Sequence, residues 1–510
     1  MAEYSGAAGL NFFEEDRLVR GIVAARLPAA DRDAALKRLS ELGALCGGEL
    51  NRLVEAAHKD GRWPELKRYD RWGNRIDEVV YCAEQKEARR LSLLAGPLPP
   101  TPLLERMTKA YLLNQNGEGG VTCPLAMTDG LVQLLESHGT PEQRKRWLGL
   151  LHDPNTSTPL TGGQFVTEKQ GGSNVSENEA SAVPSGDGTW RLTGLKWFCS
   201  NPGELWVTTA KPVGSTAVAL FLVPRRLPGG GLNECHILRL KDLTGTRGKA
   251  TAEVEYRGAY AELIGRPSRG LAILLSTVLK VSRLHVAGAA LGMIRRSWVE
   301  AGLYARSRVV TGRTAAEIPA VRASLTVLED LLLPATLAFF EELDLLEKEN
   351  SAADVLVPLL KIGVSQAATM AVREARLVLA GNATLRDFSI LPRLSEDAII
   401  QEIWEGTHPI LAGHALKALR RPASGQAFSR LLDQAGNRGP APARAVLADL
   451  RKKLDARVAA LRAAPTEEPE DAVALCLLAY RTLGTALLLR EAGGPLDAEG
   501  SLSRAAARLA

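Results

Sequence analysis

The stretch Ile403-Trp404-Glu405-Gly406-Thr407 places one carboxylate between a bulky aromatic residue and a glycine, directly after a run with the apolar spacing of a helix. Glutamate is rarely buried unless a partner or a function requires it. A glycine behind it lets the backbone bend sharply beside a ligand. A solvated helix end has the same pattern, so the meaning of Glu405 depends on the rest of the chain.

The composition is that of an ordinary globular protein with more than one structural unit. Of the 510 residues, 45% are hydrophobic and 24% are charged, and a chain of this length favours roughly two to four units. The net charge of +5 is small for the length and gives no general argument for nucleic-acid binding. Aromatic residues make up only 5%, which leaves little material for stacking on bases.

The cysteines and the apolar runs bear on the compartment. The six cysteines are scattered, with no CxxC motif and no Cys/His pairing at metal spacing, which indicates a reducing compartment and no metal site. Glu14, Glu15 and Asp16 stand where a signal peptide needs an apolar core, and no apolar run reaches the roughly 20 residues of a membrane span. We therefore expect a cytoplasmic protein without a membrane segment.

The period of the apolar residues changes twice along the chain. Up to about residue 150 the apolar residues have helical spacing, which Pro-Leu-Pro-Pro at 97–100 interrupts. Gly73-Asn74 also interrupts it and indicates a tight hairpin. From about 160 the period is 2, and the run 217–223 is that of a buried strand, so we predict a β-domain. Helical spacing returns at about 270 and continues to 420, as in a buried helix bundle.

Beyond Arg420-Arg421 the composition shifts towards Ala, Arg and Pro. Two further helical stretches follow at about 441–463 and 470–491, joined by an acidic linker at 465–471. We therefore predict a mainly α fold with one β-domain, in four parts. The parts are an N-terminal helical domain (1–158), a middle β-domain (159–265), a helical bundle that carries Glu405 (266–420) and a C-terminal helical extension (421–510).

Two distant stretches give the Glu405 segment a context. They are Thr167-Glu168-Lys169-Gln170-Gly171-Gly172-Ser173-Asn174 and Gly194-Leu195-Lys196-Trp197-Phe198-Cys199-Ser200-Asn201. In chain order, the three segments resemble the flavin and substrate framework of the acyl-CoA dehydrogenase family, whose three-domain fold has the same order of helix, β and helix. The C-terminal helices and the Arg-Tyr-Asp-x-x-Gly hairpin at 68–73 make the chain most similar to the adaptive alkylation-response, or AidB-like, branch.

The resemblance implies FAD as the cofactor and assigns roles to residues of this chain. Thr167 matches the threonine that binds the flavin ring, and Ser173 matches the serine that positions the acyl-CoA. A helix cap or a turn is the alternative for both. In the second stretch Phe198 matches the aromatic residue that packs on the ring, and the Ser200 hydroxyl matches the one that bonds flavin N5. Cys199 lies between them on the opposite strand face, as a packed core residue or a reactive thiol.

The helical bundle completes the implied cofactor site. Arg308 resembles the arginine that reaches the flavin pyrophosphate of a neighbouring subunit, for which a guanidinium is suited because its planar fork binds phosphate oxygens bidentately. A solvated surface arginine is the alternative. Gly381 and Thr407 also correspond to cofactor-binding positions. The chain departs from the family pattern at six nearby positions, which implies looser or differently arranged flavin binding: Thr311, Pro319, Ala380, Ala383, His408 and Pro409.

In this family a carboxylate removes the α-proton of the thioester while hydride leaves Cβ. The resemblance assigns that role to Glu405. Some members carry the base on a bundle helix instead, one residue before an arginine. Here Ser282 occupies that position, before Arg283, so Glu405 is the candidate with a motif behind it. We expect Arg283 to line the substrate pocket, to pin the loop that carries Glu405, or to be a buried structural arginine.

Two functions of different classes follow. The first is an FAD-dependent dehydrogenase of an acyl-CoA thioester, a homo-oligomer (tetramer expected) that passes electrons to an electron-transfer flavoprotein or another acceptor. The second is an AidB-like flavoprotein that protects DNA from alkylation, with weak or vestigial dehydrogenase activity. It needs a basic face on the C-terminal extension, for which a net charge of only +4 from residue 420 onward is weak support. The candidates are Arg451, Lys452, Lys453, Arg457 and Arg462.

Overall fold

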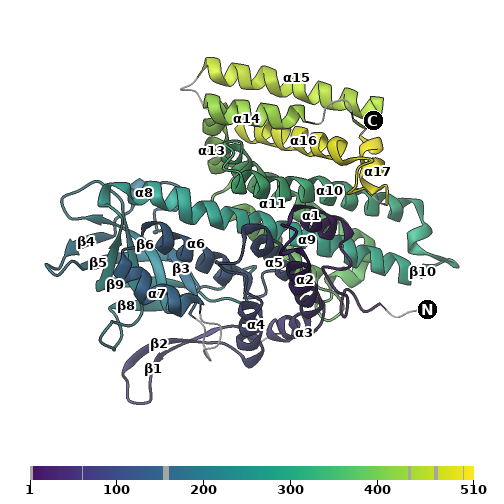
Figure 1. Cartoon of the computed structure of the whole chain (residues 1–510). Coiled ribbons are helices and arrows are strands. Elements are labelled where there is room, and N and C mark those ends of the chain that lie inside the picture. Colours follow the sequence, from purple (N-terminus) through teal and green to yellow (C-terminus); the bar gives the residue numbers. More distant parts are fainter. Residues whose placement is uncertain are drawn as a thin grey trace. The chain divides into compact units, whose positions relative to one another are not determined.

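The computed structural model describes residues 4–59, 61–152, 160–434, 438–464, 469–497 and 499–509 (Figure 1). They form two compact units, each built from segments that are distant in the sequence. The helical unit comprises Met1–Glu49, Leu103–Gly117 and Arg283–Ala510, and the mixed unit comprises Leu50–Pro102 and Glu118–Ser282. The four-part division stays a prediction. Its boundary at 158/159 and residues 465–468 of the acidic linker lie outside the described residues.

Among the described residues of the mixed unit, seven strands form one sheet. Their order is β3 (Gly162–Phe165), β6 (Leu205–Pro212), β4 (Ser181–Pro184), β5 (Trp190–Ser200), β9 (Thr251–Ile264) and β7 (Ala219–Pro224), with β8 (Cys235–Leu240) paired to β9. Because β7 also pairs with β6, the sheet closes on itself as a barrel. Phe221 of β7 packs in one core and Leu220 in a second, so this strand is buried on both faces. That burial explains its uninterrupted apolar run.

Helices of the mixed unit precede the barrel in the chain. They are most of α3 (Glu49–Ala57), α4 (Ala83–Leu94), α6 (Thr122–His138) and α7 (Pro141–His152), with α8 (Gly270–Ile273) after the barrel. Leu131 and Leu135 of α6 pack in the same core as Leu220. Thr140 and Gln143 begin α7 with a reciprocal cap: the Gln143 amide donates to Thr140 Oγ1 at 3.2 Å and the Thr140 amide to Gln143 Oε1 at 3.0 Å.

The hairpin predicted at Gly73-Asn74 is present. Its strands are β1 (Glu65–Tyr69) and β2 (Arg75–Val80). Gly73 takes the left-handed backbone (φ 84°) that the turn requires. The Asp70 carboxylate accepts the Trp72 amide at 2.8 Å, which fixes the tip.

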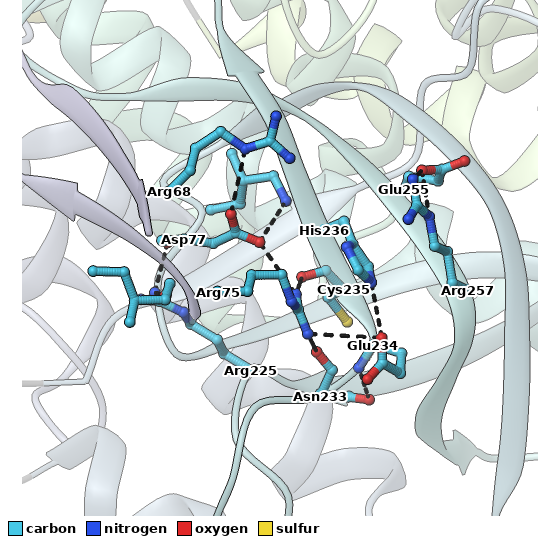
Figure 2. Close-up of polar contacts among 12 residues, drawn as sticks. Arg68, Arg75, Asp77, Arg225, Asn233, Glu234, Cys235, His236, Glu255 and Arg257 are labelled. Atoms are coloured by element: carbon cyan, nitrogen blue, oxygen red, sulfur yellow. Dashed lines mark hydrogen bonds and ion pairs between the residues drawn. The ribbon is translucent and has the colours of Figure 1, made fainter. Parts of the chain in front are cut away.

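Two arginines and one aspartate fix the base of this hairpin within the mixed unit (Figure 2). Arg75 donates to the carbonyls of Asn233 and Cys235, each at 2.9 Å, and its guanidinium lies 3.1 Å from the Asp77 carboxylate. Arg225 donates to the Asp77 carbonyl at 2.6 Å. Asp77 is only 2% exposed. We call Arg75, Asp77 and Arg225 the hairpin anchor.

The helical unit contains the remaining helices. They are α1 (Arg17–Arg26), α2 (Arg32–Gly47), α5 (Leu103–Asn114), most of α9 (Leu279–Ser307), α10 (Pro319–Glu347), α11 (Ala353–Leu379), α12 (Leu391–Ile403), α13 (His408–Arg420), α14 (Pro422–Asp433), α15 (Ala441–Ala463), α16 (Ala472–Glu491) and α17 (Ser501–Arg508), with a short hairpin of β10 (Val309–Val310) and β11 (Arg313–Thr314). Helix α11 packs against α10, α12, α13 and α16 (Figure 1). Its apolar sequence follows from burial on several sides.

In the part of the chain that the structure describes, four helical stretches are long and apolar enough, by length and composition alone, to cross a membrane. They span Pro267–Ser307, Pro319–Glu347, Ala353–Thr384 and Ala472–Glu491. The expectation that no apolar run reaches this length was wrong, because a helix keeps a high mean hydropathy across one or two charged residues. Between 50% and 83% of each apolar window is buried inside the structure.

Candidate active site

Glu405 lies in a strained turn at the end of a helix. Helix α12 ends at Ile403, and Glu405 then adopts a left-handed backbone (φ 57°), followed by Gly406 at φ 106°. That conformation costs a residue with a Cβ about 1–2 kcal/mol. Residues held in this way cluster at functional sites. The Glu405 side chain is half-buried, and Thr407 is exposed. We call Trp404–Thr407 the Glu405 loop.

Two cations from neighbouring helices bond the backbone around Glu405. Arg283 of α9 donates from Nε to the Glu405 carbonyl at 3.1 Å. Lys361 of α11 donates from Nζ to the carbonyls of Glu402, at 2.7 Å, and Gly406, at 2.8 Å. Arg283 therefore pins the loop that carries Glu405, which is one of the three roles expected for it. Its contact with a substrate stays a prediction.

Two histidines of α13 extend this network. Arg283 Nη1 lies 3.1 Å from His414 Nδ1, a contact that suits a neutral imidazole because the guanidinium can only donate. Burial lowers the pKa of His414, and the nearby Arg283 and Lys417 lower it further. His408 Nε2 lies 3.2 Å from Ser365 Oγ. Burial also lowers the pKa of His408, and both imidazoles are therefore neutral at physiological pH.

In the mixed unit, strand β5 presents the expected flavin-binding side chains. Phe198 and Ser200 are two residues apart on the strand and so share a face. Phe198 is 48% exposed, and the Ser200 hydroxyl is 3.1 Å from Thr251 Oγ1. Cys199 between them is fully buried in the barrel core, where burial raises the pKa of its thiol. Cys199 is thus a core residue and not a reactive thiol.

The loop of residues 167–173 lies beside β5. The Trp197 amide donates to the Thr167 carbonyl at 2.8 Å. A buried ion pair holds the same two segments: Lys196 Nζ is 2.7 Å from Glu168 Oε1, and both side chains are nearly or fully buried. Thr167 is half-buried and Ser173 is exposed.

These residues fit a planar aromatic cofactor such as a flavin. An exposed aromatic ring and a half-buried hydroxyl share one face of β5, and the threonine of the adjoining loop lies beside that strand. A Cβ at Gly172 would come within 2.6 Å of Thr167 Oγ1, so a side chain at position 172 would displace the Thr167 hydroxyl. The donor set supplies the hydroxyls and backbone N–H groups that a flavin edge needs.

The other expected cofactor residues lie in the helical unit, with Arg283 and Glu405. Arg308 is exposed, directly after α9. Gly381 is exposed after Ala380, which ends α11 with φ 52° and ψ −132°. Thr167, Ser173, Phe198 and Ser200 belong to the mixed unit. The assembly of both sets into one site stays a prediction.

Sequence reasoning missed three residues that organise these regions. Lys361 is the isolated polar residue of the apolar run 355–364, and that isolation was the available signal. Lys196 is a charge inside a strand pattern, which also signals a buried partner. His414 carried no signal, because a histidine on a helix is common and its contact with Arg283 joins positions 131 residues apart.

Comparison with known families accounts for most of the chain. Residues 5–155 match the adaptive response protein AidB N-terminal domain, residues 163–259 the acyl-CoA dehydrogenase middle domain, and residues 268–419 the acyl-CoA dehydrogenase C-terminal domain. Acyl-CoA dehydrogenase family member 11 of Caenorhabditis elegans is 31% identical over 438 residues, which cover 80% of this chain and 70% of the relative. The putative acyl-CoA dehydrogenase AidB of Escherichia coli K12 is 30% identical over 393 residues, which cover 71% and 70%.

Solved structures agree with this assignment. The crystal structure of Caenorhabditis elegans ACDH-11 in complex with C11-CoA is similar over 100% of this chain and 92% of that chain, with a TM-score of 0.91 and 27% identity. Butyryl-CoA dehydrogenase from Megasphaera elsdenii shares the fold over 81% and 99%, with a TM-score of 0.63 and 18% identity.

The fold class expected from the sequence is therefore confirmed: N-terminal helices, a middle β-barrel, a helical bundle and additional C-terminal helices. Members of the matching family bind FAD and act as oxidoreductases on acyl-CoA thioesters. The chain belongs to the acyl-CoA dehydrogenase family, in its AidB-like branch.

Proposed function

We propose that the protein dehydrogenates an acyl-CoA thioester between Cα and Cβ, with Glu405 as the base that takes the α-proton. Family membership supports the dehydrogenation in general. The observation that carries the choice of base is the fixed backbone of the Glu405 loop, whose left-handed glutamate is held by cations from α9 and α11. A general base must be held in place to act, and this arrangement provides that restraint.

The chain's residues have distinct tasks in this scheme. The Glu405 carboxylate accepts the proton from Cα. Bound FAD supplies the hydride acceptor. The hydroxyls of Thr167 and Ser200 and the Phe198 ring hold the flavin ring system, and Ser173 positions the acyl-CoA.

The acyl group and the electron acceptor are the open parts of the scheme. We propose a short, branched or aromatic thioester, with an electron-transfer flavoprotein or another acceptor as electron partner, in the cytoplasm. A C. elegans relative was crystallised with C11-CoA, so a medium-length linear thioester belongs in the same test. The first experiment is an anaerobic titration of the purified yellow protein with these thioesters. Bleaching of the oxidised flavin band by at least one of them is expected; no bleaching by any would contradict the proposal.

Protection of DNA is not favoured by the C-terminal extension. Arg451 lies 2.9 Å from Asp455 and 3.2 Å from Asp433. Lys453 lies 2.6 Å from Asp449. Arg457 pairs with Asp471, and Arg462 donates to the carbonyl of Leu419 at 3.1 Å. Most of the candidate basic face is therefore balanced by carboxylates within the described residues, and salt-dependent binding of duplex DNA should be weak.

We further propose a homo-oligomer, a tetramer, in which Arg308 reaches the flavin of a neighbouring subunit. Its exposure is compatible with that reach. Since a ligand that binds only the assembled state stabilises it, Arg308→Ala should lose FAD and weaken assembly together, whereas Arg306→Ala, an exposed neighbour on α9, should do neither. Light scattering and the visible spectrum measure both effects. A monomeric Arg308→Ala protein with full flavin content would show that the arginine acts otherwise.

A further inference from the structure

Lys361 is an unusual lysine within the described residues. Its side chain is fully buried in α11. Lysine is almost never fully buried unless it is paired, and two other buried lysines of this chain are paired with carboxylates. Lys109 lies 2.8 Å from the Glu105 carboxylate, and Lys196 lies 2.7 Å from that of Glu168. Lys361 instead bonds two backbone carbonyls.

The two carbonyls stand on either side of Glu405. The Glu402 carbonyl is in the last turn of α12, where carbonyls have no partner within the helix. The Gly406 carbonyl follows Glu405 directly. A lysine amine has at least two N–H groups in either protonation state, so it can hold both carbonyls at once. A cation there also suits the negative end of the helix dipole.

Together with Arg283, this lysine restrains the loop from two helices. The carbonyls of Glu402, Glu405 and Gly406 all accept hydrogen bonds from cationic side chains. These bonds hold the backbone of Glu405 in its strained left-handed conformation. Because the backbone conformation sets the direction of the Cα–Cβ bond, the bonds also orient the Glu405 side chain.

Titratable groups from α9, from α12 with the loop after it, and from α13 act on Lys361 or respond to its charge. Glu402 and Glu405 come from α12 and the loop after it, Arg283 from α9, and His408 from α13. Burial lowers the pKa of Lys361 to about 7; the two carboxylates oppose that change and Arg283 adds to it. Because the interaction of two charges is mutual, an ammonium group at position 361 favours the ionised form of Glu405.

We propose that Lys361 is a positioning residue for the base: its amine holds the Glu405 loop through the carbonyls of Glu402 and Gly406, and its charge keeps Glu405 ionised. The inference rests on the proposed role of Glu405. Lys361 therefore has two effects, support of the loop and an electrostatic effect on Glu405. Loss of the lysine should change both the rate of proton removal and its pH dependence.

The test compares wild type, Lys361→Met and the matched control Lys109→Met, each as the full FAD-loaded chain. Methionine keeps the length of the side chain and removes the donors and the charge. The rate of flavin reduction by a thioester that bleaches the wild type is measured against pH. We expect Lys361→Met to lose about tenfold in rate at neutral pH and to move the acidic limb of the profile upward by about one pH unit. The KM for the thioester should stay near that of wild type.

The control should keep the wild-type profile, since Glu105 retains its bidentate partner Arg38. An unshifted acidic limb in Lys361→Met would overturn the electrostatic part of the inference even if the rate fell. If Lys361→Met does not fold, Lys361→Gln takes its place, because it keeps a donor and removes the charge.

Hydrogen exchange separates this inference from the proposed function. Amides of the segment 403–411 should exchange at least about tenfold faster in Lys361→Met than in wild type, without any substrate. Unchanged exchange would overturn the positioning role. If no thioester bleaches the wild type, the proposed function fails, while the exchange result still decides whether Lys361 holds the loop.

Discussion

The hairpin anchor and the Glu405 loop both use cationic side chains to hold backbone carbonyls, and they differ in how the charge is balanced. In the anchor, Arg75 bonds two carbonyls and also pairs with the buried Asp77. At the loop, Lys361 donates its hydrogen bonds to two backbone carbonyls, and its charge interacts with the carboxylates of Glu402 and Glu405. In the anchor the charge of Arg75 is balanced by Asp77, and the contacts hold strands β1 and β2 to the barrel. At the loop, the charge of Lys361 acts on Glu405, the proposed base.

The comparison predicts that changes at the loop alter rate first. Glu405→Gln keeps size and hydrogen bonding and cannot accept a proton, so flavin reduction should fall by about 10²–10⁴-fold, with FAD content unchanged. Glu396→Gln, on the preceding helix α12 and paired with Arg386 at the surface, is the control and should stay near wild type. Stopped-flow reduction with an acyl-CoA that bleaches the wild type measures both. Equal rates for Glu405→Gln and wild type would place the base elsewhere.

Changes at the anchor should alter stability first. Arg75→Met leaves the buried Asp77 without its closest cation, and breaking a buried pair from one side costs about 3–5 kcal/mol. Arg71→Met, at the exposed tip of the same hairpin, should cost less than about 0.5 kcal/mol. Calorimetry of both variants tests this difference. Once folded at low temperature, Arg75→Met should retain the wild-type pH profile of flavin reduction, and a shifted profile would erase the distinction between the two regions.

Much of the fold follows from local sequence signals. The uninterrupted run 217–223 predicted a buried strand, and β7 is indeed buried on both faces. Gly73-Asn74 predicted the hairpin, and strand alternation placed Cys199 on the opposite face from Phe198 and Ser200. Each of these signals lies within a few residues of the feature that it predicts.

The contacts that organise the site could not be predicted from local sequence signals. Lys361 and Gly406 are 45 residues apart, and Arg283 and Glu405 are 122 residues apart. The sequence showed an isolated lysine and one arginine with three alternative roles. Only the tertiary arrangement, with α11 packed against α12 and Arg283 of α9 beside the loop that follows, decides which carbonyls the two cations reach. The anchor has the same cause, since Arg75 bonds residues about 160 positions away.

The buried Lys361 should also make the stability of the wild-type protein depend on pH in a way that Lys361→Met does not share. Burial lowers the pKa of Lys361 from an ordinary 10.5 to about 7 in the folded protein. Between these values the unfolded chain binds more protons than the folded chain, so the free energy of unfolding rises with pH, and below about pH 7 the full burial penalty is present. Relative to Lys361→Met, wild type should gain about 2 kcal/mol between pH 7 and pH 9. His408 and His414 titrate below this window, because burial lowers the pKa of both imidazoles. Denaturation at several pH values measures the difference, and parallel curves would contradict it.

The smallest predicted effect concerns Ala380, whose backbone is strained like that of Glu405 but has no proposed role in catalysis. Ala380 shares a positive φ with Glu405, and its ψ of −132° lies in a region that favours glycine. It is exposed, and its amide donates to the Arg376 carbonyl as the cap of α11. Ala380→Gly should therefore relieve strain and stabilise the protein by about 1 kcal/mol, after the entropy that glycine adds to the unfolded chain. Ala323→Gly, at an exposed position inside α10, should destabilise by about 1 kcal/mol. Calorimetric Tm values of the two variants should move in opposite directions, and a decrease for both would show that the backbone at 380 is not strained.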